Sequence, residues 1–270
     1  MISIKNLSVS IESTQLLHNI SATLPAGKLS ICLGRNGAGK STLLKAICRD
    51  IPAEGTVQYK DIPADKLTNR FMATRRAIVS QHGRLSFDFT VEEVVLMGRI
   101  PQINGFETDH DYQVAEHCMQ KLGVLRFRTR SYPSLSGGEK QRVRCAAALA
   151  QIWDNIEEKT PTYLFLDEPT SSLDLAHQHQ LLHLLKEIAQ KGVTVFAIVH
   201  DLNLVAQYGE HLLVLHEGKL FKEGPPAKIF HPGIIKQAFG CPVHIIKPAQ
   251  TGCPFIIAQH NSNNESYAFQ

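Results

Sequence analysis

Residues 34–42 read Gly34-Arg35-Asn36-Gly37-Ala38-Gly39-Lys40-Ser41-Thr42, and this stretch decides the fold because it meets the pattern G-x-x-x-x-G-K-[ST] in full. Its glycines let the backbone turn sharply and bring N–H groups close to phosphate oxygens at the start of a helix. The Lys40 ammonium would neutralise the β- and γ-phosphates, and the Ser41 hydroxyl would hold Mg²⁺. The stretch therefore predicts a nucleotide-phosphate loop.

The segments on either side of this loop predict a strand before it and a helix after it. Leu29 to Leu33 is a short apolar run, which is typical of a buried strand. Ser41 to Ile47 carries Leu43 and Leu44 at helical spacing. A strand, a phosphate loop and a helix in this order favour an α/β fold.

Composition limits the classes of protein that this chain can belong to. Of its 270 residues, 43% are hydrophobic and 20% charged, as in an ordinary globular protein. The net charge of +3 is too small to indicate a nucleic-acid partner. No apolar run reaches the roughly 18 residues of a membrane span, no signal peptide is evident, and six scattered cysteines favour reduced thiols. We therefore expect a cytoplasmic chain that does not bind nucleic acid.

Short β-rich runs before and after the loop predict further strands. Ile2 to Lys5 and Ile20 to Leu24 predict antiparallel N-terminal strands, and Glu54 to Tyr59 predicts another strand. Ala77 to Ser80 is short and apolar, and the polar Gln81 follows it. Because ligands bind at the carboxyl ends of strands in α/β sheets, Gln81 is a candidate site residue.

Residues 84–152 change to a helical pattern. A capping box at residues 90–93 opens a helix from Val91 to Arg99, and a second helix ends at Gly123. A third helix runs from the segment Leu135 to Arg142 as far as about Trp153. We predict an inserted helical subdomain at 84–152, a nucleotide-binding core made of 1–83 and 153–258, and a frayed tail at 259–270.

The third helix opens with a second phosphate-seeking motif, Ser136-Gly137-Gly138-Glu139. Two glycines at a helix N-terminus expose N–H groups at its positive end. The chain therefore has two phosphate-seeking surfaces, this motif and the phosphate loop, but only one nucleotide loop. This mismatch predicts that two chains share their sites.

Two more polar groups follow apolar strands. Thr162 to Leu166 leads into Asp167 and Glu168, and Val193 to Val199 leads into His200. Asp167 can hold Mg²⁺ directly or through water, and Glu168 can face the water that attacks the γ-phosphate. His200, at a neighbouring strand end, is a candidate γ-phosphate sensor.

The order of these motifs resembles that of ATP-binding cassette (ABC) transporter ATPases over about residues 2–225. The resemblance implies a RecA-like phosphate-loop ATPase core and two cassettes that sandwich two ATP molecules. Each ATP would bind one chain's phosphate loop and the other chain's Ser136, Gly137, Gly138 and Glu139. Gln81 would contact the γ-phosphate and Mg²⁺ and link them to the helical subdomain, which meets a transmembrane partner in this family. The cassette would lie peripherally on the cytoplasmic face of the cell membrane.

Finer motifs resemble one branch of that family. Met97-Gly98-Arg99 followed by Pro101 is similar to iron-siderophore, haemin and cobalamin importers, and residues 87–90, 149–153 and 171–175 are most similar to haemin importer ATPases. The resemblance implies permease subunits and, indirectly, a periplasmic or surface substrate-binding protein as partners.

One position departs from the family and leaves the adenine contact open. The family places an adenine-stacking ring near the N-terminal strand turn, and the matching residue here is Val9. We therefore expect weak base discrimination unless Tyr59, Phe221 or a ring of the partner chain reaches the base. One rival function is a cassette that acts on DNA or ribosomes, but such cassettes carry long insertions that are not found in this sequence. Another is a non-hydrolysing cassette, and the presence of Glu168 and His200 argues against it.

Overall fold

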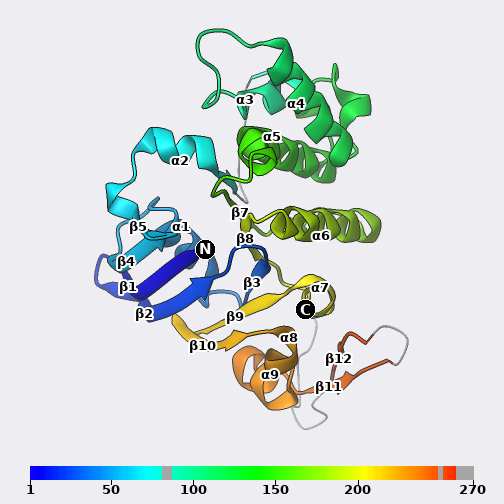
Figure 1. Ribbon diagram of the computed structural model, residues 1–270. Helices are drawn as coiled ribbons and strands as arrows, with labels where there is room; N and C mark the ends of the chain where they lie inside the picture. The colour runs from blue at the N-terminus through cyan, green and yellow to red at the C-terminus, as the bar shows by residue number, and fades with distance from the viewer. Residues whose placement is uncertain (81–86, 249–251, 260–270) are drawn as a thin grey trace.

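The computed structural model describes residues 1–80, 87–248 and 252–259, and its central unit is a six-stranded sheet (Figure 1). Five strands are parallel and the edge strand β10 is antiparallel to β9. Their order is β10 (Lys219–Gly224), β9 (His211–His216), β3 (Leu29–Leu33), β8 (Thr194–Ile198), β7 (Tyr163–Asp167) and β6 (Arg76–Val79). The parallel strands end at one edge of the sheet, where ligands bind in open α/β folds.

A second, antiparallel sheet confirms the predicted N-terminal strands. Its strands are β2 (Thr14–Leu24), β1 (Ile2–Ile11), β4 (Glu54–Tyr59) and β5 (Ile62–Pro63). Strands β1 and β2 form one hairpin that is longer than the two predicted runs. Irregular pairing between Ile4 and Ser10 breaks the alternation of apolar and polar residues. The sequence pattern therefore predicts only the first residues of β1 and the last residues of β2.

Alternate residues of the central strands face two different hydrophobic cores. Ile31 of β3 packs with the helical layer, whereas the adjacent Cys32 packs with the antiparallel sheet and α1 (Lys40–Ile47). Phe165 and Phe196 point to the same side as Cys32. Burial on both faces explains why these strands read as continuous apolar runs.

Helices α3 (Val91–Met97), α4 (Asp109–Lys121) and α5 (Gly137–Glu157) lie together above the sheet, with α6 (Leu175–Gln190) between them and the C-terminal part (Figure 1). The predicted end of α5 near Trp153 was too early. Ile156, only 2% exposed, continues the buried face of the helix through polar residues that favour loops. Helix α2 (Asn69–Arg75) was not predicted because it is short and mostly polar. Short 3₁₀ turns occupy Ala64–Lys66, Leu125–Phe127 and Tyr132–Ser134.

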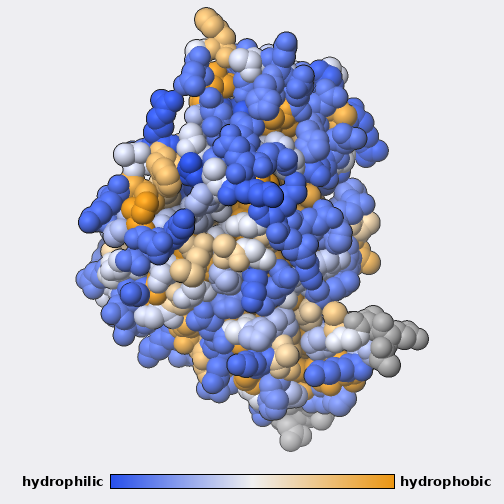
Figure 2. All heavy atoms as spheres, in the orientation of Figure 1, coloured by the Kyte–Doolittle hydropathy of each residue, from blue (hydrophilic) through white to orange (hydrophobic). Residues whose placement is uncertain are grey.

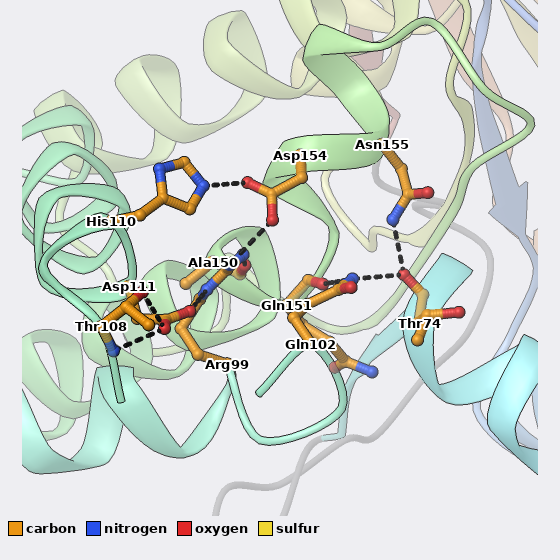
Figure 3. A network of polar contacts seen from close by, with 10 residues as sticks. All are labelled: Thr74, Arg99, Gln102, Thr108, His110, Asp111, Ala150, Gln151, Asp154 and Asn155. Carbon is orange, nitrogen blue, oxygen red and sulfur yellow. Dashed lines mark hydrogen bonds and ion pairs between the residues drawn. The ribbon is translucent and has the colours of Figure 1, made fainter. Parts of the chain in front are cut away.

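Arg99 is the buried centre of a polar network that joins these helices (Figure 3). Its Nε lies 2.9 Å from Asp111 Oδ1, and its Nη2 lies 2.7 Å from Asp154 Oδ2. Its Nη1 donates to the Ala150 carbonyl oxygen at 2.8 Å. Gly98 lets α3 approach α5 closely, because a Cβ there would lie 2.1 Å from the Ala147 carbonyl oxygen. The motif at 97–99 therefore packs the helices of this layer together.

Amide side chains then bond this layer to Thr74 of α2 (Figure 3) and to Arg76 of β6. Gln102 Nε2 and Asn155 Nδ2 both donate to the Thr74 carbonyl oxygen, at 3.0 and 2.8 Å. Gln151 Nε2 donates to the Arg76 carbonyl oxygen at 2.9 Å. The helices are thus bonded directly to the strand that precedes Gln81.

The C-terminal part adds α7 (Leu202–Tyr208), α8 (Pro226–Ile229), α9 (Pro232–Phe239) and a hairpin of β11 (Val243–Ile246) and β12 (Phe255–Ala258). A further hairpin, of β9 and β10, lies between α7 and α8 in the chain, and the three short helices were not predicted. Of the predicted tail, only Gln259 lies among the described residues.

The visible surface in Figure 2 is largely hydrophilic, with apolar side chains in small groups. Within the described ranges, the longest and most apolar helices still fall short of what a membrane crossing requires.

Candidate active site

The phosphate loop connects β3 to α1, and two of its glycines are required by close contacts. A Cβ on Gly34 would lie 2.4 Å from the Leu215 carbonyl oxygen, and one on Gly39 would lie 2.6 Å from Leu17 Cδ2. Both residues also have positive φ angles, 148° and 97°. A side chain at either position would displace the loop, so its N–H groups keep the open approach that phosphate needs.

Lys40 is held over this loop by main-chain oxygens. Its ammonium donates to the carbonyl oxygens of Gly34 and Arg35 at 2.8 and 2.9 Å, and the residue is 6% exposed. Burial lowers the pKa of Lys40, while nearby Cys32 and the carboxylates of Glu168 and Asp167 work in the opposite direction. The Lys40 ammonium therefore lies against the main chain of the phosphate loop.

The predicted Mg²⁺ ligands Ser41 and Asp167 meet between α1 and β7. Ser41 Oγ donates to Asp167 Oδ1 at 3.1 Å. Burial raises the pKa of Asp167, and the Ser41 hydrogen bond opposes that rise. Hydroxyl and carboxylate oxygens are the hard donors that Mg²⁺ prefers, so these residues fit the ion. The third predicted ligand, Gln81, lies outside the described residues.

Glu168 and His200 form the other close pair at the strand ends. His200 Nε2 lies 2.6 Å from Glu168 Oε1, and their side chains are 39% and 20% exposed. Glu168 has a φ of 51°, which is strained for a residue with a side chain. The Ser171 N–H and hydroxyl both donate to the Glu168 carbonyl oxygen and hold the turn. The turn and the contact with His200 hold the Glu168 carboxylate in place, which makes it a candidate general base.

The Ser136 motif caps α5 and leaves its first turn exposed. Glu139 N–H donates to Ser136 Oγ at 3.3 Å, and Ser136 N–H donates to the Glu139 carboxylate at 2.8 Å. These hydrogen bonds hold the pKa of Glu139 below its ordinary value. A Cβ on Gly138 would lie 2.8 Å from the Ser172 carbonyl oxygen, so glycine is needed where the helix meets that loop.

A hollow of about 460 Å³ lies against this motif, lined partly by Arg126, Ser172, Asp174 and His177. The phosphate-loop residues are not among the described residues that line it. Among the described residues, this hollow therefore belongs to the Ser136 motif and not to the phosphate loop. Arg126 was not among the site residues that the sequence predicted, and its position beside Ser136 makes it a candidate anion contact.

Val9 does not occupy the position that we expected. Its side chain is 1% exposed and packs in the core beneath the antiparallel sheet, so it cannot face a base. Tyr59 is excluded as well, because it is 2% exposed and its hydroxyl donates to the Ile47 carbonyl oxygen at 3.0 Å. Of the rings considered within this chain, Phe221 remains partly exposed.

Comparison with known proteins identifies the class. Residues 17–171 match the family model described as ABC transporter. The chain is also 28% identical, with a TM-score of 0.78, to an inward-facing transporter described as of metal-chelate type, covering 97% of this chain and 98% of that one. A dimeric bacterial ABC transporter cassette gives 28% identity and a TM-score of 0.72 over 84% of this chain and 99% of that one. This chain therefore belongs to the ABC transporter family, as an ATP-hydrolysing cassette.

Two curated relatives are more similar in sequence. The Hemin import ATP-binding protein HmuV of Gloeobacter violaceus is 41% identical over 95% of this chain and 94% of its own length. The protein of the same name from Deinococcus radiodurans is 41% identical over 95% of this chain and 97% of its own length. The resemblance to the importer branch is confirmed.

Proposed function

We propose that this chain is the ATP-hydrolysing subunit of a bacterial importer that takes up haemin through a separate transmembrane permease. The close pairing of Glu168 with His200 beside a complete phosphate loop carries the hydrolytic part of this proposal. The haemin part rests on near full-length similarity to proteins named for hemin import. A ferric siderophore or cobalamin is the alternative cargo.

The residues at the strand ends define the hydrolytic mechanism. The phosphate loop and Lys40 hold the β- and γ-phosphates, with Ser41, Asp167 and Gln81 as the proposed Mg²⁺ ligands. Bound Mg²⁺ would neutralise charge that develops on the phosphates. Glu168 accepts a proton from the attacking water, and His200 orients that carboxylate and senses the γ-phosphate.

A second copy of the chain completes each site. Ser136, Gly137 and Gly138 offer N–H groups at the start of α5, and the described lining of the hollow beside them includes no residue of the phosphate loop. A homodimer in which each signature motif faces the partner's phosphate loop would bind two ATP molecules. A dimeric bacterial cassette of the same fold supports this arrangement.

The permease would meet the face where the helical layer joins the core. Two hollows of about 640 and 520 Å³ share Arg49 and Asp50 at the end of α1. The second is also lined by Ala73, Arg76 and Gln151. The Gln151 amide of α5 donates to the carbonyl oxygens of Ala73 in α2 and Arg76 in β6. A permease segment seated there would contact both parts at once. The cassette would then lie peripherally on the cytoplasmic side of the cell membrane.

The test of cargo is ATP hydrolysis by the transporter reconstituted with its permease and binding protein. We expect haemin-loaded binding protein to stimulate turnover, with the unloaded binding protein as control. Stimulation by a ferric siderophore or cobalamin, and none by haemin, would refute the haemin assignment and leave the importer proposal in place.

A further inference from the structure

The helix that follows His200 is bonded to the C-terminal hairpin. Asn203, in the first turn of α7, uses both ends of its side-chain amide on the backbone of Ile256 in β12. Asn203 Oδ1 accepts from the Ile256 N–H at 2.8 Å, and its Nδ2 donates to the Ile256 carbonyl oxygen at 3.3 Å. This is the pairing that a neighbouring strand would make. The hairpin therefore fixes the first turn of α7.

Asp201 connects that turn to the histidine. Its carboxylate caps α7 by accepting from the N–H groups of Asn203 and Leu204 at 2.7 and 3.0 Å. His200 immediately precedes this cap, and Val199, 1% exposed, anchors the chain in the core on the other side. The position of His200 is thus set by β8 before it and by the capped, hairpin-bound turn after it.

Packing supports the same connection. The side chains of Ile256 and Val243 are 7% and 8% exposed and belong to the hydrophobic core that contains Leu204 and Val205. The opposite face of the hairpin exposes Phe255. Only one face of this small sheet is buried, and that face supports α7.

The same C-terminal segment also approaches the side chain of the phosphate-loop residue Arg35. Gly240 ends α9 with a φ of 72°, and a Cβ there would lie 3.4 Å from Arg35 Nη1. The described residues of this segment, 225–248 and 252–258, therefore lie close to two parts of the site, the Arg35 side chain and the histidine turn.

We propose that Asn203 is a positioning residue and that residues 225–248 and 252–258 act as a brace, which holds His200 at hydrogen-bond distance from Glu168. This inference rests on the proposed roles of those two residues in hydrolysis. Nucleotide is held by the phosphate loop, whereas Glu168 and His200 act on the reacting water and γ-phosphate. Loosening the brace therefore slows turnover without weakening ATP binding.

The test compares Asn203→Ala with the parent in steady-state ATP hydrolysis and in hydrogen exchange of the peptide 199–204. We expect kcat to fall by about fivefold or more, as for a lost hydrogen bond, while KM for ATP stays within about twofold. Exchange of the peptide should become faster. Asn203→Asp keeps the acceptor for the Ile256 N–H but lacks the donor, and its kcat should lie between those of the parent and Asn203→Ala.

Ile156→Val, in α5 and outside the brace, is the matched control. It removes a buried methylene but leaves the contacts between α7 and the hairpin, so we expect a lower Tm with the parental kcat. A parental kcat in Asn203→Ala, a raised KM alone, or the same loss of kcat in Ile156→Val would overturn the brace. Parental turnover in Glu168→Gln would instead overturn the hydrolytic proposal on which it rests.

Discussion

At the scale of single residues, Glu168 combines a strained backbone with a short contact to His200. Such strain persists only where the surrounding structure enforces it, here through the turn held by Ser171. The energy stored in this turn is consistent with a carboxylate that must point in one direction for proton transfer.

Replacing Glu168 with Gln tests that role. The change keeps the shape of the side chain but removes its basicity, so we expect turnover to fall by about 10²–10⁴-fold. ATP affinity, measured by nucleotide titration, should be retained because the phosphate loop is unchanged. Turnover within about threefold of the parent would remove Glu168 from the mechanism.

Sequence reasoning identified which polar residues follow the strands but could not describe their surroundings. The phosphate-loop pattern and the apolar strands were enough to predict that these residues lie near one another. The structure places Ser41 against Asp167 and Glu168 against His200. The burial of Val9 was missed because Val9 was placed by similarity to the family alone, and irregular strand pairing next to it hides which face it occupies.

At the scale of elements, the helical layer depends on the buried pair of Arg99 and Asp111. Burial favours a higher pKa for Asp111, but hydrogen bonds from Thr108 and Arg99 outweigh it and hold the pKa below its ordinary value. The depressed pKa means that this carboxylate stabilises the fold above its unfolded pKa of about 3.9, and the contribution is lost as pH falls further.

Asp111→Asn should therefore destabilise the protein in a pH-dependent way. Removing one partner of a buried pair costs about 3–5 kcal/mol, and because Arg99 keeps Asp154, we expect a loss of about 3 kcal/mol at pH 7. Denaturant unfolding of parent and variant should show this difference shrinking below about pH 4. Asp109→Asn, on the exposed first turn of the same helix, is the control. A difference that does not change with pH would contradict the ion-pair account.

The limits of prediction at this scale have a physical cause. Strong periodicity and a capping box made α3 and most of α5 predictable. Helices α2, α7, α8 and α9 have at most eight residues each and acquire their stability from contacts distant in sequence, such as those of Asn155 with Thr74 and of Asn203 with Ile256. A single sequence does not display such contacts.

At the scale of the whole molecule, the described residues that line the hollow beside Ser136 do not include the phosphate loop of the same chain. The sequence contains two phosphate-seeking surfaces but only one phosphate loop, which predicts that two chains share their sites. The structure adds that the hollow beside Ser136 is lined by Arg126, Asp174 and His177. We propose that a second copy of the chain brings these groups to the phosphates that Lys40 would bind.

ATP hydrolysis by mixed variants tests this shared site most directly. Ser136→Arg blocks the partner's site by bulk, and Lys40→Ala removes the phosphate contact of its own loop, so neither variant alone should turn over ATP. Random mixing should place one intact composite site in about half of the dimers. We predict that activity returns on mixing, while Ser136→Arg alone still binds nucleotide. Parental hydrolysis by Ser136→Arg alone, or no recovery in dimers shown to have mixed, would contradict the account.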